Sequence, residues 1–138
     1  MADKLDDEFR IALMRIARRI RQQRLDDTLS DSQLSVLYVL THHGGSTLAA
    51  LAEHERVTPP SMNRTVNCLS DDGLITRSSS PDDGRKVLIE ATDAGTELVN
   101  KTRQRRAEWF AAELATLNAS EHDALQAAIP VLMKLANS

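Results

Sequence analysis

The sequence has few aromatic residues, one cysteine and no long apolar run. Aromatic side chains make up 3% of the 138 residues, and Leu and Ala supply most of the apolar ones. Such a core favours helices, because Ala and Leu lose little conformational freedom on entering one. The single cysteine, Cys68, excludes an intramolecular disulfide and is typical of a reducing compartment. No segment reaches transmembrane length, and residues 1–8 are acidic rather than a basic-then-apolar signal peptide. We therefore expect a cytoplasmic protein with no membrane association.

Length and charge fit a single globular domain but do not identify its partner. Of the residues, 41% are hydrophobic and 27% are charged, which is typical of a packed domain. The net charge of −3 argues only mildly against nucleic acid, because the distribution of charge matters more than its sum. Arginines recur between residues 10 and 24 and basic residues between 101 and 106, whereas acidic residues gather at 3–8 and 26–31. The net charge therefore leaves the partner open.

The hydrophobic spacing predicts a mainly helical chain with one β-hairpin. Apolar residues at three- and four-residue steps are typical of amphipathic helices, and two short segments instead have the character of strands. We expect helices over about 4–24, 30–43, 47–55, 58–72, 92–117 and 120–135, and strands over 74–78 and 86–90.

Caps and turns support these boundaries. Ser30 and Gln33 have the spacing of a capping box, and Thr58 precedes a proline at the first helical position. Asp83–Gly84 suits a tight turn between the strands, because Gly tolerates a positive φ. Pro130 lies inside the last helix and should kink or split it.

The order of these elements predicts a winged helix-turn-helix: a helix, a short helix, a third helix and then the hairpin. In this arrangement the N-terminal half of the helix over 58–72 enters the DNA major groove, and the hairpin forms a wing beside it. The positions of Val57, Met62, Val66 and Leu69 allow these side chains to face the core. Side chains able to meet base edges or phosphates give the candidate DNA-binding set of Thr58, Ser61, Asn63, Arg64, Asn67, Arg85 and Lys86.

Each candidate also has a purely structural interpretation. The polar residues of the helix could form a solvated face, although the hairpin behind them favours DNA contact. Arg85 could be an ion-pair partner of Asp82 or Asp83, and could still approach DNA.

Three segments resemble the MarR family (multiple antibiotic resistance regulators). Leu29–Leu37 resembles the family's second helix, and Leu48–Glu53 with Val57–Arg64 resembles its helix-turn-helix. The most specific segment, Asp83–Gly95, is similar to the family's wing signature. In that signature an Asp is followed two residues later by an Arg, and a Leu-Thr pair and then a Gly follow further along the chain. Ala91 stands in place of that Leu, and Arg56 stands where such turns often have Gly.

The resemblance implies a homodimeric DNA-binding repressor, or less often an activator, whose terminal helices form the dimer interface. It implies a single domain over residues 1–138, with a winged helix-turn-helix lobe over about 30–91 and dimerisation helices over about 4–25 and 92–137. The residues support dimerisation independently, because a module of this size cannot cover the apolar stripes of its terminal helices. We expect Trp109 near that interface.

Many members of the family release DNA on binding a small aromatic or phenolic ligand. Tyr38 and His42 lie one helical turn apart and are candidates for such an effector site, with Arg19 as an anchor for an anionic ligand. The alternative is a packed tyrosine, a surface histidine and an arginine on a solvated face.

No other chemistry is indicated. Cys68 is expected to be structural, because nothing near it in the sequence would activate its thiol. The four His residues lack metal-ligand spacing, and no catalytic triad or phosphate loop is present, so we expect neither cofactor nor enzyme. The alternative function is a winged-helix protein-interaction module that does not bind DNA.

Overall fold

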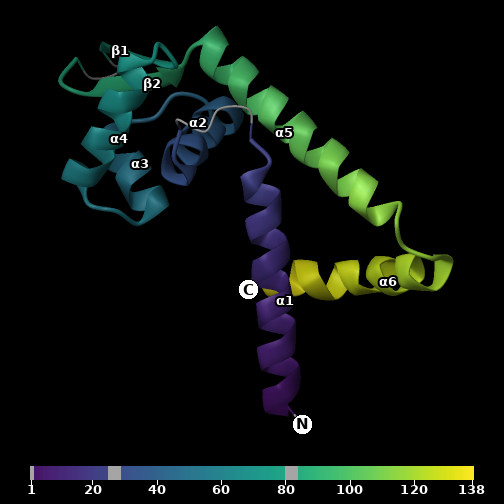
Figure 1. Cartoon of the computed structure of the whole chain (residues 1–138). Helices are drawn as coiled ribbons and strands as arrows, with labels where there is room; N and C mark the ends of the chain where they lie inside the picture. Colours follow the sequence, from purple (N-terminus) through teal and green to yellow (C-terminus); the bar gives the residue numbers. More distant parts are fainter. Residues whose placement is uncertain (1, 25–28, 80–83) are drawn as a thin grey trace. The chain divides into compact units, whose positions relative to one another are not determined.

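The chain divides into two units, and one long helix runs from the first into the second. The computed structural model describes residues 2–24, 29–79 and 84–138 (Figure 1). One unit, called here the winged unit, comprises Gln23–Arg105, and the other, called the terminal unit, comprises Met1–Gln22 and Arg106–Ser138. Helix α5 (Asp93–Leu114) belongs to both. No helix in the described part of the chain has both the length and the apolar character needed to cross a membrane.

The winged unit has the order expected of a winged helix-turn-helix. Three helices come first, α2 (Asp31–His43), α3 (Leu48–Glu55) and α4 (Pro59–Asp71). The antiparallel strands β1 (Ile75–Ser79) and β2 (Val87–Ala91) follow, each displaced by one residue from the expected range. Ser46 adds a short bridge beside β2 at Ile89. The mainly helical fold with a hairpin wing is confirmed.

A Leu- and Val-rich core holds the three helices against the hairpin. Leu37 of α2, Leu51 of α3 and Val66 of α4 are fully buried, and Ile89 of β2 closes the core from the sheet. Met62 and Leu69 are also buried, as the spacing of α4 predicts. Val57 is 41% exposed, so it does not join the core. It follows Arg56, whose left-handed backbone (φ 57°) ends α3 and redirects the chain.

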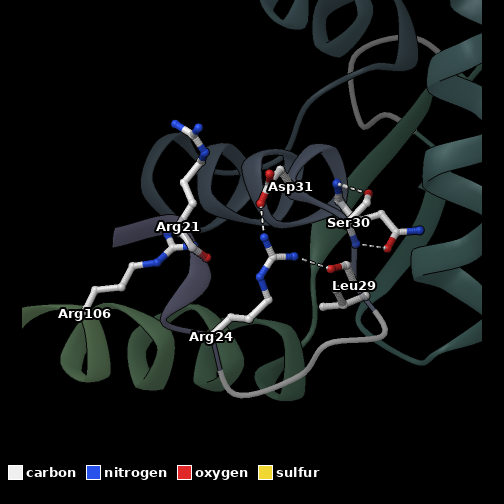
Figure 2. A network of polar contacts seen from close by, with 7 residues as sticks. Arg21, Arg24, Leu29, Ser30, Asp31 and Arg106 are labelled. Atoms are coloured by element: carbon white, nitrogen blue, oxygen red, sulfur yellow. Dashed lines mark hydrogen bonds and ion pairs between the residues drawn. The ribbon is translucent and has the colours of Figure 1, made fainter. Parts of the chain in front are cut away.

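Local hydrogen bonds begin the helices where the capping residues indicated. Ser30 Oγ accepts from Gln33 N at 3.1 Å, and Gln33 Oε1 accepts from Ser30 N at 2.9 Å (Figure 2). Arg24 ties the chain before α2 to this cap, because it donates to the Leu29 carbonyl at 2.7 Å and also pairs with Asp31 (Figure 2). The capping box that begins α2 is therefore confirmed.

The hairpin connection falls partly outside the described residues, and the last helix is continuous through Pro130. The strands pair as far as Ser79 and Val87, and the tight turn expected at Asp83–Gly84 includes a residue outside the described ones. Gly84 has no positive φ, which among the described glycines occurs at Gly44 and Gly73, and Asp83 lies outside the described residues. Helix α6 (Ala119–Ala136) contains Pro130 without being split. A box of Asn118 and Glu121 begins it, slightly earlier than expected.

In the terminal unit, α1 (Ala2–Gln22) packs on the second half of α5. The Arg19 guanidinium lies 4.9 Å from the ring centroid of Trp109, and its Nη2 lies 3.4 Å from Glu113 Oε1. Arg106 donates to the Arg21 carbonyl at 3.3 Å (Figure 2). These contacts leave apolar side chains exposed on α1 and α6, among them Leu5, Phe9, Met14, Ile129 and Met133.

Candidate nucleic-acid interface

Helix α4 presents a polar face opposite its buried one. Because Met62, Val66 and Leu69 point into the core, the positions between them face outward. Asn63, Arg64 and Asn67 are exposed, and Ser61 is partly exposed. Amide and guanidinium groups therefore line one side of the helix, and no acidic residue occurs on it before Asp71.

Thr58 contributes by placing the start of α4. Its Oγ1 accepts a hydrogen bond from Ser61 N at 3.2 Å, and Pro59 occupies the first turn, where a missing N–H costs nothing. The helix N-terminus is thereby ordered and exposed, and it carries the positive end of the helix dipole. Such an end suits an anionic group such as a DNA phosphate.

Arg85 and Lys86 are exposed in the connection just before β2. The alternative interpretation of Arg85, an ion pair with Asp82 or Asp83, involves residues outside the described ones.

Arg77 is a basic residue of this surface that the sequence analysis missed. It lies on β1, exposed, and donates a hydrogen bond to Oδ1 of Asn67 on α4. The side chain of Asn67 therefore already has a hydrogen-bond partner within the protein. A signal was available: Arg77 follows the buried Ile75 by two residues, and alternate residues of a strand share a face.

The effector candidates Tyr38 and His42 form a cluster with a third residue, Arg103 of α5. The two rings lie with centroids 4.2 Å apart, and Arg103 Nη1 lies 3.1 Å from His42 Nε2. The guanidinium carbon is 5.9 Å from the Tyr38 ring centroid, within reach of a cation–π contact. Tyr38 is 45% exposed, so it is not a packed core tyrosine.

Arg19, the third effector candidate from the sequence, belongs to the terminal unit, where it contacts Trp109 and Glu113.

Cys68 lies exposed on α4 and takes no part in the core. It follows the outward-facing Asn67, and the helix turns it away from the buried Val66 and Leu69.

Comparison with known proteins identifies the family. Residues 29–87 match the model of the MarR family. The chain is 42% identical over 132 residues to an HTH-type transcriptional regulator of Mycobacterium tuberculosis, a match that covers 96% of this chain and 92% of the relative. It is 29% identical over 117 residues to the HTH-type transcriptional repressor NicR of Pseudomonas putida, covering 85% and 74% of the two chains.

Solved structures share the fold. A MarR family protein from Bacillus stearothermophilus superposes with a TM-score of 0.81 at 16% identity, over 99% of this chain and 96% of the other. BpsR of Bordetella bronchiseptica, whose DNA binding is regulated by 6-hydroxynicotinic acid, superposes with a TM-score of 0.67 at 23% identity, over 97% and 94%. The helix order, the hairpin wing and these matches together show that the chain belongs to the MarR family of DNA-binding transcriptional regulators and is not an enzyme.

Proposed function

We propose that the protein is a transcriptional repressor that binds an inverted-repeat operator as a homodimer and is released by a small aromatic anion. The observation that carries the proposal is that Asn63, Arg64 and Asn67 are exposed on α4, and that the basic Arg85 and Lys86 are exposed just before β2. Repression is supported by the relative NicR, which is a transcriptional repressor.

The α4 residues and the wing residues have different tasks in this proposal. Amide and guanidinium groups of Asn63, Arg64 and Asn67 suit the donor and acceptor groups of bases in the major groove. Arg85 and Lys86 supply charge for phosphates or the adjacent minor groove. A two-fold symmetric dimer then places two α4 helices in successive major grooves, with half-site centres about one helical turn apart.

Homodimerisation is supported by the apolar surface of the terminal unit. Leu5 of α1 is 71% exposed, and Ile129 and Val131 of α6 are 54% and 60% exposed. A monomer rarely leaves so many large apolar side chains in water, and a second copy of the chain is the occupant that two-fold operator binding requires. We accordingly assign α1, α6 and the second half of α5 to dimerisation, and residues of about 30–91 to DNA binding.

Effector binding is proposed at the cluster of Tyr38, His42 and Arg103. An exposed phenol ring and an imidazole offer stacking surfaces, and a guanidinium offers paired donors to a carboxylate. These groups suit a planar aromatic acid. BpsR, a structural neighbour, is regulated by such a compound, which makes 6-hydroxynicotinic acid a reasonable first probe.

Nuclease footprinting on the DNA upstream of the protein's own gene tests the proposal. We expect protection of an inverted repeat, and loss of protection when an aromatic acid from a panel is added. A triple variant with Asn63, Arg64 and Asn67 all changed to Ala serves as control, and should fold but protect nothing.

Absence of any protected or selected DNA sequence for the intact dimer would instead favour the alternative, a winged-helix protein-interaction module. Protection that no aromatic acid alters would leave the DNA-binding proposal in place and remove the effector.

A further inference from the structure

We infer that Arg77 determines which base Asn67 recognises, by fixing the orientation of the Asn67 amide so that it favours guanine over adenine. The inference rests on the proposed binding of DNA by α4 and adds a specificity-determining residue that lies outside the helix itself.

The fold holds Arg77 against α4. Arg77 lies on β1 two residues after the buried Ile75 and directly opposite the buried Ile89 of β2. It therefore stands on the face of the hairpin that packs toward the helix. From there its guanidinium donates to Oδ1 of Asn67. In the described part of the chain, no other protein group forms a hydrogen bond with either side chain.

The chemistry of the pair leaves one orientation of the amide. Arg has five N–H donors and no acceptor, so it can bond only the oxygen of an amide. Rotating the Asn67 amide by half a turn would set its NH2 group against the guanidinium, donor against donor. Arg77 therefore keeps Oδ1 on its own side and leaves the Nδ2 hydrogens for an outside partner.

This orientation discriminates between the two purines. In the major groove guanine presents two acceptors, N7 and O6, whereas adenine presents an acceptor at N7 and a donor at N6. The usual bidentate pairing of Asn with adenine uses both the oxygen and the nitrogen of the amide. Arg77 occupies one lone pair of Oδ1. Its positive charge beside that oxygen disfavours the approach of the adenine amino group, so the Nδ2 hydrogens are the groups that Asn67 presents most readily. Guanine satisfies those donors.

Selection of DNA sequences by the full-length protein tests the inference. A pool of duplexes with a randomised centre is enriched on the wild type and on Arg77→Ala, Arg77→Lys and Asn67→Ala, and the enriched base pairs are compared position by position. We expect the wild type to prefer guanine to adenine roughly fivefold or more at one symmetric position in each half-site.

The variants should then separate orientation from charge. Asn67→Ala should remove the preference at that position alone, and Arg77→Ala should shift it toward adenine, because the amide can then rotate. Arg77→Lys should keep guanine, since an ammonium group also only donates. Lys86→Ala is the charge-matched control, and should weaken binding to all sequences without moving the preferred base.

The opposite results are equally distinct. If Arg77→Ala bound every sequence more weakly but kept the wild-type preference at each position, Arg77 would act by charge alone and the inference would be overturned. An Asn67-dependent preference for adenine in the wild type would also overturn it. A wild type that enriches no sequence would refute the proposed DNA binding itself, and the inference with it. Circular dichroism and the urea midpoint of each variant confirm that these exposed substitutions leave the fold intact.

Discussion

The backbone of Gly95 lies directly against the carbonyl oxygen of Leu74, with no room for a side chain between them. A Cβ built at position 95 would overlap that oxygen and would also lie 3.2 Å from Cδ2 of Leu37. The same carbonyl accepts a hydrogen bond from Thr92 N at 3.0 Å, and Thr92 Oγ1 donates to the Gly73 carbonyl at 2.8 Å. The first turn of α5 is therefore locked to the chain that enters β1, and the Gly of the wing signature is required by this contact.

Gly95→Ala should consequently destabilise the protein by about 1–3 kcal/mol, because backbone atoms would have to move to admit the methyl group. Urea denaturation at fixed protein concentration measures the change. Gly84→Ala is the matched control: it has no atom within 4 Å of the new Cβ and no positive φ, and should change the midpoint little. Equal effects of the two substitutions would contradict the contact.

Arg85 and Arg64 should support DNA binding in different ways. Arg85→Ala should reduce affinity for operator and random DNA alike. It should also make the dependence of log affinity on log salt concentration shallower, by about one unit of slope for each lost phosphate contact. Arg64→Ala, if that residue reads a base, should cost roughly 1–3 kcal/mol per base on the operator alone, doubled in the dimer. Fluorescence anisotropy across a salt series separates the two. Full discrimination retained by Ala variants of Asn63, Arg64 and Asn67 would show that α4 is not the recognition helix.

Removal of Arg103 should strongly weaken the response to an aromatic acid without abolishing DNA binding. Coupling between effector and DNA sites is typically about 1–3 kcal/mol, so the wild-type affinity for operator should fall roughly five- to a hundred-fold when the acid is bound. Arg103→Ala should reduce this shift strongly, because it removes the guanidinium beside His42 and Tyr38. Lys101→Ala, which removes a cation paired with Glu97 on the same helix, is the control and should retain the response.

The dimer should depend on the exposed apolar face of α6. Leu125 and Ile129 lie one turn apart and are 45% and 54% exposed. Changing both to Lys should convert the dimer to a monomer at micromolar concentration, since charges would have to be buried without partners. Sedimentation equilibrium gives the mass, and Gln126→Lys on the same helix controls for charge alone. A wild type that sediments as a monomer would contradict the proposed assembly.

Glu97 offers a test of the structure by titration. The hydrogen bond from Lys101, at 2.7 Å, and its positive charge hold the pKa of Glu97 below the ordinary 4.5. Because the folded-state pKa is the lower one, any stabilisation from this pair is present above about pH 4.5 and is lost as the pH falls through the folded-state value. Lys101→Ala should raise the pKa of Glu97 toward its ordinary value in an NMR titration. An unchanged pKa would mean that the pair does not form in solution.

Much of the fold follows from local sequence signals. The capping box at Ser30 and Gln33 and the cap at Thr58 involve atoms three residues apart, so the sequence alone predicts where α2 and α4 begin. The spacing of Met62, Val66 and Leu69 likewise predicts the buried face of α4, and hence which of its residues are exposed. The three segments that resemble the family, of which the last ends at Gly95, together indicate it.

Packing between separate elements determines what those exposed residues contact. Arg77 reaches Asn67 from another element, and Arg103 reaches His42 across 61 positions of sequence, so no local spacing relates the partners. Val57 has an apolar side chain in a helix-turn-helix segment, yet the left-handed Arg56 before it turns it outward. Local periodicity determines which side of an element is polar. The neighbours that a polar side chain meets depend on how the elements pack together, and that is set by the whole core.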